Sequence, residues 1–305
     1  MMKGRAVPMI KEGARKVLIL AALAVVLTGF GLTAAAKGGP EMSVKVEQKV
    51  CRAADGVEIV YSVAGTGEPA LVFIHGGFAD RGFWDAQLQA FGGRHKTIAL
   101  DLAGHGESGT NRTKWGMKEF GADVQAVVEA EKVKRVVLIG NSLGGPVAIE
   151  AALLLPGKAV GVIGIDTFQD LGRRITPEEA KAQADAFGGD FVATVKQMAR
   201  ALFHPDADPK IVAWAEERMA RTSPQIARPM FLSLAGYDPG EAARRLNVPI
   251  RAVNGDLFPT DVEAIRKVKP DFDAVVMKHM GHYPMIERPA EFNRLLAGVI
   301  AGLGK

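Results

Sequence analysis

The chain has 305 residues, and its 38 Lys and Arg against 34 Asp and Glu give a formal net charge of +4. Residues 1–36 hold five of the basic residues and one of the acidic ones, so residues 37–305 contain 33 of each sign. A folded part without net charge has no general attraction for nucleic acid or for an anionic membrane surface, and both are excluded as expected partners.

The first 36 residues have the pattern of a targeting segment. Five Lys and Arg side chains precede an uncharged apolar run over 17–32, and the small residues 34–36 supply a cleavage site. This pattern predicts a signal peptide and an exported, periplasmic or extracellular protein. The uncharged stretch 17–36 is also about long enough to cross a bilayer. A membrane anchor formed by an uncleaved leader is therefore the alternative.

Residues 37–305 fit one large α/β domain. Two apolar runs flank Asp55-Gly56, which is a hairpin signal, and further runs follow along the chain. The predicted strands cover 50–53, 57–64, 70–74, 96–100, 136–139, 159–165, 250–253 and 274–277. The predicted helices cover 118–131, 146–155, 261–268 and 290–301. Strands that alternate with helices predict a mostly parallel sheet covered on both faces.

The block 167–245 breaks this alternation. It is poor in strand signals and has apolar residues at three- and four-residue spacings, as at Phe191, Val195, Met198 and Leu202. Because the block lies between two predicted strands, it must leave the sheet and return to it. We interpret it as a helical cap inserted before the last two strands; helices that merely cover an edge of the sheet are the alternative.

The segment 136–145 carries the most specific signal. A buried strand runs into Gly140-Asn141-Ser142-Leu143-Gly144, and an Ala- and Leu-rich helix follows. A Gly-x-Ser-x-Gly turn between a strand and a helix is the setting of a nucleophilic serine, because the sharp turn exposes the hydroxyl above the sheet. The sequence therefore predicts Ser142 as a nucleophile.

A serine hydroxyl needs a base and a group that orients the base. His282 follows the last predicted strand in a Gly-containing loop, so it is expected at the same sheet edge as Ser142. Asp256 follows the preceding strand and completes the chain order Ser, Asp, His. Asp166, directly after the strand 159–165, is the main alternative acid. Asp261 is a second alternative, although it is better explained as the first residue of a helix.

Acyl transfer also needs donors for a developing oxyanion. The backbone N–H of Leu143, directly after the nucleophile, is expected to be one of them. The other is expected in the loop after the strand 70–74, with Gly77 preferred over Phe78. His75 in the same loop is predicted to be a buried structural histidine, and the single Cys51 a buried or edge-strand thiol.

Together these motifs resemble the α/β-hydrolase superfamily. The resemblance rests on His75-Gly76-Gly77, on the segment 101–108, on the turn around Ser142 and on Gly281-His282, in the order found in that family. It implies an α/β-hydrolase fold, a catalytic set of Ser142, Asp256 and His282, and a structural turn at 101–108. A serine nucleophile sets the chain apart from the relatives that use aspartate, such as haloalkane dehalogenases.

The predicted function is therefore a serine hydrolase that cleaves a carboxylic ester or related acyl compound without a metal or organic cofactor. A carbon–carbon bond hydrolase is the enzymatic alternative, and it would require cationic cap residues for a substrate carboxylate. The candidates are Arg173, Arg174, Arg200 and Arg221. A non-catalytic protein that binds a hydrophobic ligand is the remaining alternative. The turn that contains His204, Asp206 and Asp208 is expected to be solvated, and the sequence leaves the oligomeric state open.

Overall fold

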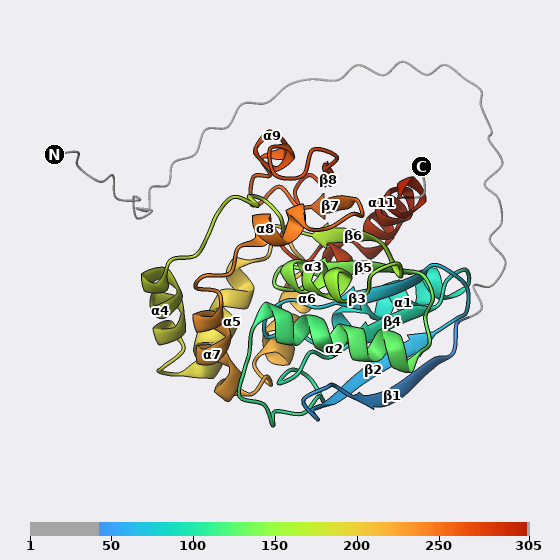
Figure 1. Ribbon diagram of the computed structural model, residues 1–305. Helices are drawn as coiled ribbons and strands as arrows, with labels where there is room; N and C mark the ends of the chain where they lie inside the picture. The colour runs from blue at the N-terminus through green and yellow to red at the C-terminus, as the bar shows by residue number, and fades with distance from the viewer. Residues whose placement is uncertain (1–42, 304–305) are drawn as a thin grey trace, which may run out of the picture. The chain divides into compact units, whose positions relative to one another are not determined.

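The computed structural model describes residues 43–303, which form one compact unit around a single eight-stranded sheet (Figure 1). The strand order is β1-β2-β4-β3-β5-β6-β7-β8. The pairs β1–β2 and β2–β4 are antiparallel, and all later pairs are parallel. The strands are β1 (Val46–Arg52), β2 (Glu58–Ala64), β3 (Ala70–Ile74), β4 (Thr97–Leu100), β5 (Val136–Asn141), β6 (Ala159–Ile165), β7 (Ile250–Asn254) and β8 (Asp273–Val276).

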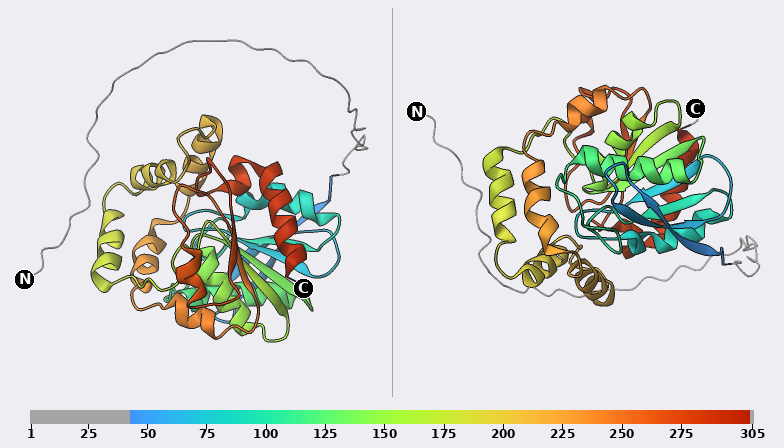
Figure 2. Two further views of the ribbon diagram at one scale, coloured as in Figure 1. Left: turned by 90° about the horizontal axis from the view of Figure 1, so that it is seen from above. Right: turned by 60° about the horizontal axis from the view of Figure 1, so that its bottom comes forward.

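Helices cover both faces of this sheet, which is why its central strands are apolar along their whole length. All residues of β3, β4 and β5 are buried. Helices α2 and α3 pack against each other on one face, and α1 lies beside α11 on the opposite face (Figure 2). These outer helices, with the short ones near the C-terminus, are α1 (Asp85–Gly92), α2 (Met117–Ala130), α3 (Gly144–Leu154), α9 (Val262–Arg266), α10 (Pro284–Glu287) and α11 (Pro289–Gly302).

The segment between β6 and β7, residues 166–249, is here named the β6–β7 insertion. Its regular structure is helical apart from one bridge between Ile175 and Ala235, and α4 packs on α7 while α5 packs on α6. Figure 1 shows α4, α5 and α7 grouped to one side of the sheet. The helices are α4 (Pro177–Ala186), α5 (Phe191–Ala201), α6 (Pro209–Met219), α7 (Ala227–Ser233) and α8 (Pro239–Arg244), with two 3-10 turns, η1 (Arg81–Trp84) outside the insertion and η2 (Pro224–Ile226) within it.

The predicted α/β-hydrolase fold is confirmed, since each of the eight predicted strands overlaps an observed one. The differences lie at element ends, where a frayed turn and an extended strand have similar composition. The last strand covers Asp273–Val276 rather than 274–277, and α9 is shorter than the predicted helix 261–268. The predicted leader lies outside the described residues. Among those described, no helix is long and apolar enough to cross a membrane.

Candidate active site

Ser142 lies at the carboxyl end of β5 in a strained turn. Its φ of +52° is in the left-handed region, which non-glycine residues rarely adopt. A Cβ on Gly140 would come within 2.0 Å of the Gly144 carbonyl oxygen, and a Cβ on Gly144 within 2.5 Å of the Ile74 oxygen. These glycines allow strand, turn and helix to pass close together. The turn brings Ser142 to the start of α3, where the helix dipole favours negative charge.

His282 is paired with Asp166. Its Nδ1 lies 2.5 Å from Oδ2 of Asp166, and both side chains are buried. The other carboxylate oxygen of Asp166 accepts a hydrogen bond of 2.9 Å from the Gly255 backbone N–H. Asp166 has a φ of +43°, a conformation that Asp tolerates better than most residues. The buried carboxylate therefore orients the imidazole and fixes its Nδ1 as the protonated nitrogen.

The prediction that Asp256 orients His282 is wrong. Oδ1 of Asp256 accepts a hydrogen bond of 3.1 Å from the Met280 backbone N–H, and Oδ2 lies 3.9 Å from Nζ of Lys278. The Met280 N–H lowers the pKa of this carboxyl group. The loop 277–283, between β8 and α10, is here named the histidine loop. Gly255 of the β7 loop is in close contact with it, and Asp256 lies one residue further along, two residues after the end of β7. The alternative aspartate, Asp166, has the contact instead.

The other alternative acid, Asp261, has the role that its position predicted. Its carboxylate accepts a hydrogen bond of 2.9 Å from the Ala264 backbone N–H at the start of α9. Such a cap supplies an acceptor to one of the free N–H groups of the first turn. Asp261 is therefore a structural residue.

Two buried asparagines join the loops that follow β5, β6, β7 and β8. Sequence reasoning missed both. Asn141, next to Ser142, donates through Nδ2 to the carbonyl oxygens of Ile165 and His282, at 2.9 and 3.0 Å. Asn254 brackets Thr167: it donates to the Thr167 oxygen at 3.1 Å and accepts from its N–H at 3.3 Å. Their only sequence signal is that each is a polar residue at the end of a buried strand.

Gly77 and Leu143 line the same cavity as Ser142. Within residues 43–303, neither backbone N–H has an acceptor within hydrogen-bond distance. In the loop that contains Gly77, the imidazole of buried His75 donates to the Gly76 oxygen at 2.7 Å and accepts from the Leu102 N–H at 3.0 Å, so it ties this loop to the end of β4. Burial lowers the pKa of His75. His75 is thus a neutral structural residue, as predicted.

The β6–β7 insertion contacts the loop after β3, which contains Gly77 and Phe78. Thr222 donates its hydroxyl to the Phe78 carbonyl oxygen at 2.7 Å. Arg218 on α6 pairs with Asp80 through two contacts of 2.6 Å. Phe78 itself has a φ of +63° and packs its ring against Phe187 of the insertion. The insertion therefore helps to hold the loop that carries Gly77.

A cavity of about 300 Å³ opens beside Ser142. Its wall is apolar and comes largely from α5, α7 and the residues that directly follow these two helices. Besides Ser142, Gly77 and Leu143, it is lined by Phe78, Pro146, Met198, Leu202, Met230, Phe231, Leu234 and Tyr283. The apolar lining favours an apolar ligand group.

The comparison with known proteins assigns the family. The family model described as the alpha/beta hydrolase family matches residues 71–295. This chain belongs to the alpha/beta hydrolase family. A pimeloyl-[acyl-carrier protein] methyl ester esterase from Aliivibrio fischeri is 26% identical over 235 residues, which cover 73% of this hydrolase and 90% of that protein. Three other curated relatives are 32%, 32% and 28% identical, and the match covers only 38%, 40% and 29% of their length.

Solved structures share the fold of this hydrolase. A thermophilic esterase from Thermogutta terrifontis has a TM-score of 0.74 at 20% identity, over 85% of this chain and all (100%) of that chain. Est816, an N-acyl homoserine lactone degrading enzyme, has a TM-score of 0.68 at 26% identity, over 81% and 99% of the two chains. The first likeness shows the fold alone.

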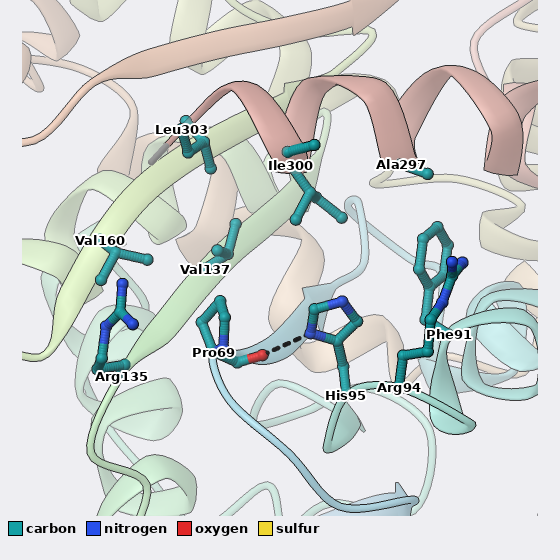
Figure 3. A pocket seen from close by; sticks show the side chains of 11 residues that line it. Pro69, Phe91, Arg94, His95, Arg135, Val137, Val160, Ala297, Ile300 and Leu303 are labelled. Carbon is teal, nitrogen blue, oxygen red and sulfur yellow. Dashed lines mark hydrogen bonds between the residues drawn. The ribbon is translucent and has the colours of Figure 1, made fainter. Parts of the chain in front are cut away.

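Other polar groups of the hydrolase have structural surroundings. Asp101, in the predicted structural turn, accepts from the backbone N–H groups of Arg81 and Glu107 at 2.7 and 2.9 Å. Cys51 is a half-buried thiol of β1, and burial raises its pKa to about 11. At the far end of the sheet, a second cavity of about 350 Å³ contains His95, whose Nδ1 bonds the Pro69 carbonyl oxygen (Figure 3).

Proposed function

We propose that this hydrolase cleaves a carboxylic ester or a related acyl compound through an acyl-enzyme formed on Ser142. His282 is the general base, and Asp166 orients it. The observation that carries the proposal is the buried Asp166–His282 pair at the same sheet edge as a serine held in a strained elbow. A nucleophile, a base and an orienting carboxylate are the three parts that serine hydrolysis requires.

The proposed reaction has two halves. Nε2 of His282 takes the proton of Ser142 as the hydroxyl oxygen attacks the acyl carbon, and the backbone N–H groups of Leu143 and Gly77 stabilise the oxyanion. His282 then protonates the leaving alcohol. In the second half, His282 activates a water that attacks the acyl-enzyme, and the acid and free Ser142 are released.

The cavity supports an apolar acyl group as the part of the substrate that is enclosed. Met198, Leu202 and Met230 offer it dispersion contacts and no charge. The β6–β7 insertion, acting as a cap, would close over this group and exclude water. Short and medium acyl chains are therefore the expected substrates.

The carbon–carbon alternative lacks the cationic groups it would need. In the described residues no arginine lines the cavity. Three of the four nominated arginines pair with carboxylates elsewhere: Arg173 contacts Glu179, Arg174 contacts Asp238, and Arg200 contacts Glu216. The fourth, Arg221, does not line the cavity either. A substrate carboxylate would lie unpaired against apolar side chains, at a cost of several kcal/mol.

A series of p-nitrophenyl esters from acetate to laurate tests the proposal on the purified chain. We expect turnover by the wild type and a loss of about 10⁴-fold or more in Ser142→Ala, because the nucleophile is removed. A fluorophosphonate should label Ser142, as read by peptide mass spectrometry.

Two results would contradict the proposal. One is ester turnover that survives in Ser142→Ala. The other is folded wild-type protein that neither hydrolyses any ester nor reacts with the fluorophosphonate. Saturable binding of a hydrophobic ligand, equal in wild type and Ser142→Ala and without turnover, would favour the ligand-binding alternative instead.

A further inference from the structure

Three side chains with metal-binding atoms meet where the β6–β7 insertion touches the histidine loop. His204 and Asp206 belong to the turn between α5 and α6, and His279 belongs to the loop between β8 and α10. One ligand atom from each residue lies within 4.8 Å of the other two. The sequence predicted a solvated turn for His204 and Asp206. His279 is exposed and lies after the end of β8.

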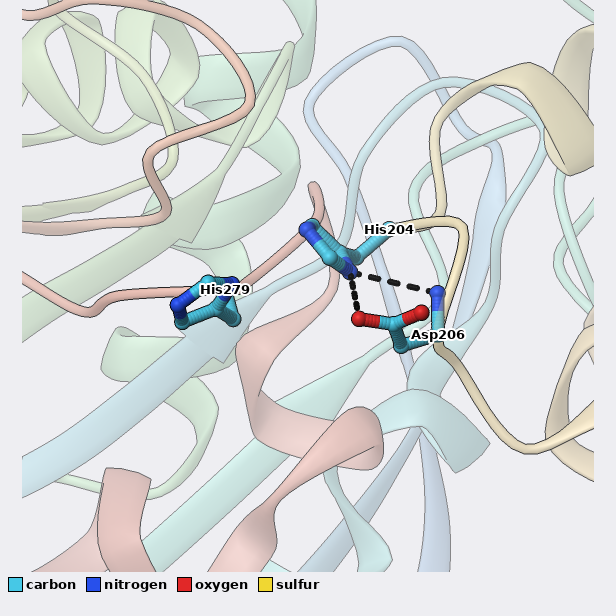
Figure 4. Close-up of side chains that lie close together, drawn as sticks. All are labelled: His204, Asp206 and His279. Atoms are coloured by element: carbon cyan, nitrogen blue, oxygen red, sulfur yellow. Dashed lines mark hydrogen bonds and ion pairs between the residues drawn. The ribbon is translucent and has the colours of Figure 1, made fainter. Parts of the chain in front are cut away.

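The three side chains lie close together, and Nδ1 of His204 accepts a hydrogen bond of 3.2 Å from the Asp206 backbone N–H. Figure 4 shows His204 between Asp206 and His279. Nδ1 of His204 lies 3.6 Å from Oδ2 of Asp206, and the two imidazole rings are 5.7 Å apart at an angle of 84°. An ion with bonds of about 2.0–2.2 Å needs these atoms somewhat closer together. The side chains of Asp206 and His279 are exposed, so rotation about their own bonds can supply that shift.

The backbones beneath these side chains are already fixed against each other. A Cβ on Gly281 would come within 2.5 Å of the His204 backbone nitrogen, so the turn that contains His204 and the histidine loop are in close contact. The His282 N–H donates to the Leu202 carbonyl oxygen at 2.8 Å. The half-buried Glu287 carboxylate accepts from the N–H groups of Gly281 and Tyr283. The backbone segments that carry the three side chains are therefore already held in place, which lowers the entropic cost of binding an ion.

The charged groups nearby are mixed in sign. Asp256 and Glu287 accept hydrogen bonds from the histidine loop itself. Arg288 donates to the His279 carbonyl oxygen at 3.1 Å and pairs with Glu291 at 3.0 Å. Lys278 lies 3.9 Å from Asp256. Both of these cations therefore have a carboxylate partner other than Asp206.

We propose that His204, Asp206 and His279 bind one Zn²⁺ ion, with water completing the coordination. Two imidazoles and one carboxylate suit zinc, whereas Mg²⁺ and Ca²⁺ prefer sets made of oxygen alone. The ion joins the β6–β7 insertion to the loop that carries His282. This site is separate from the cavity beside Ser142, and it stands whether or not the proposed ester hydrolysis is correct.

Calorimetric titration of the metal-free, untagged chain with ZnCl₂ tests the site. We expect one ion per chain, and about tenfold or greater weakening in both His204→Gln and His279→Gln, because each removes a ligand. His95→Gln, at the far end of the sheet, is the matched control and should bind as the wild type does. Zn²⁺ should also raise the thermal midpoint of the wild type and of His95→Gln but not of the other two, and MgCl₂ should have no such effect.

The proposal fails if the wild type binds no Zn²⁺. It also fails if His279→Gln binds Zn²⁺ as tightly as the wild type, since the ion would then use only the turn that contains His204. Circular dichroism of each metal-free variant verifies that the fold is intact. This control is needed at His279, because its φ of +51° lies in the left-handed region, which glutamine adopts less readily than histidine.

Discussion

The loops after β6 and β7 offer the same chemical group at the same edge of the sheet, yet only one of the two carboxylates contacts His282. Asp166 directly follows β6, is buried and is bonded to Nδ1 of His282. Asp256 follows β7 by two residues and instead contacts the backbone of Met280. A carboxylate at the right sheet edge is thus insufficient, because one residue of spacing decides what it meets.

The β7 loop supports the β6 loop and does not itself contact His282 through a carboxylate. Its Gly255 N–H donates to Asp166, and Asn254 brackets Thr167 on the other side of the same aspartate. The end of β7 therefore holds the β6 loop in its turn. The two loops form one hydrogen-bonded unit in which β6 supplies the carboxylate and β7 positions it.

Exchange of each carboxylate for an amide is the strongest way to break this comparison. Asp166→Asn should lower kcat/KM for p-nitrophenyl esters by about 10³–10⁴-fold, because the amide no longer stabilises the imidazolium or its productive tautomer. Asp256→Asn, the matched control, should stay within about threefold of wild type, as expected for a side chain that does not touch the base. Equal losses in the two variants would contradict the assignment.

Removal of the two hydrogen bonds between Asn254 and Thr167 should show how much the end of β7 contributes to the stability of the β6 loop. Asn254→Ala breaks both hydrogen bonds to Thr167 and should lower the free energy of unfolding by about 2–3 kcal/mol, measured by urea denaturation. Ester turnover should fall as well, since the turn that contains Asp166 loses its brace. Replacement of the exposed Asn111 by Ala should change neither quantity, and an Asn254→Ala chain as stable as wild type would show that the bracket is dispensable.

A methyl group on Gly255 should sharpen the comparison by pushing the β7 loop away from the histidine loop. The added Cβ would come within 2.5 Å of the Gly281 and Met280 carbonyl oxygens. Gly255→Ala should therefore cost about 1–3 kcal/mol of stability through overpacking. Gly93→Ala, where a Cβ meets nothing within 4 Å, is the control and should be neutral or slightly stabilising. A neutral Gly255→Ala would mean that the loops can separate freely.

The smallest effect concerns the pH dependence of Asp256. Its pKa is lowered in the folded state by the Met280 N–H, so the carboxylate stabilises the fold above its unfolded pKa of about 4 and loses this effect as the pH falls below that value. Asp256→Asn should lower the thermal midpoint slightly at pH 6. The difference from wild type should shrink at lower pH, as followed by differential scanning fluorimetry; a difference that grows instead would contradict the sign.

Much of the fold was readable because it depends on local patterns. The central strands are apolar along their length since both faces are covered, and the turn around Ser142 has its glycines where strand and helix approach most closely. His282 could be placed because it follows the last strand in a glycine-containing loop. These features depend on neighbours in the chain.

The choice of acid, the asparagine bridges and the histidine cluster could not be read in the same way. Asp166 and His282 are separated by 116 positions, Asn141 and the His282 carbonyl by 141, and Asn254 and Thr167 by 87. Which of several aspartates meets a given imidazole depends on how far each side chain lies past its strand and on the turn it occupies. The sequence by itself determined the sheet, the elbow and the place of His282. Only the tertiary structure decided which carboxylate reaches the imidazole of His282, because hydrogen bonds between loops are set by the packing of strands that are distant in the chain.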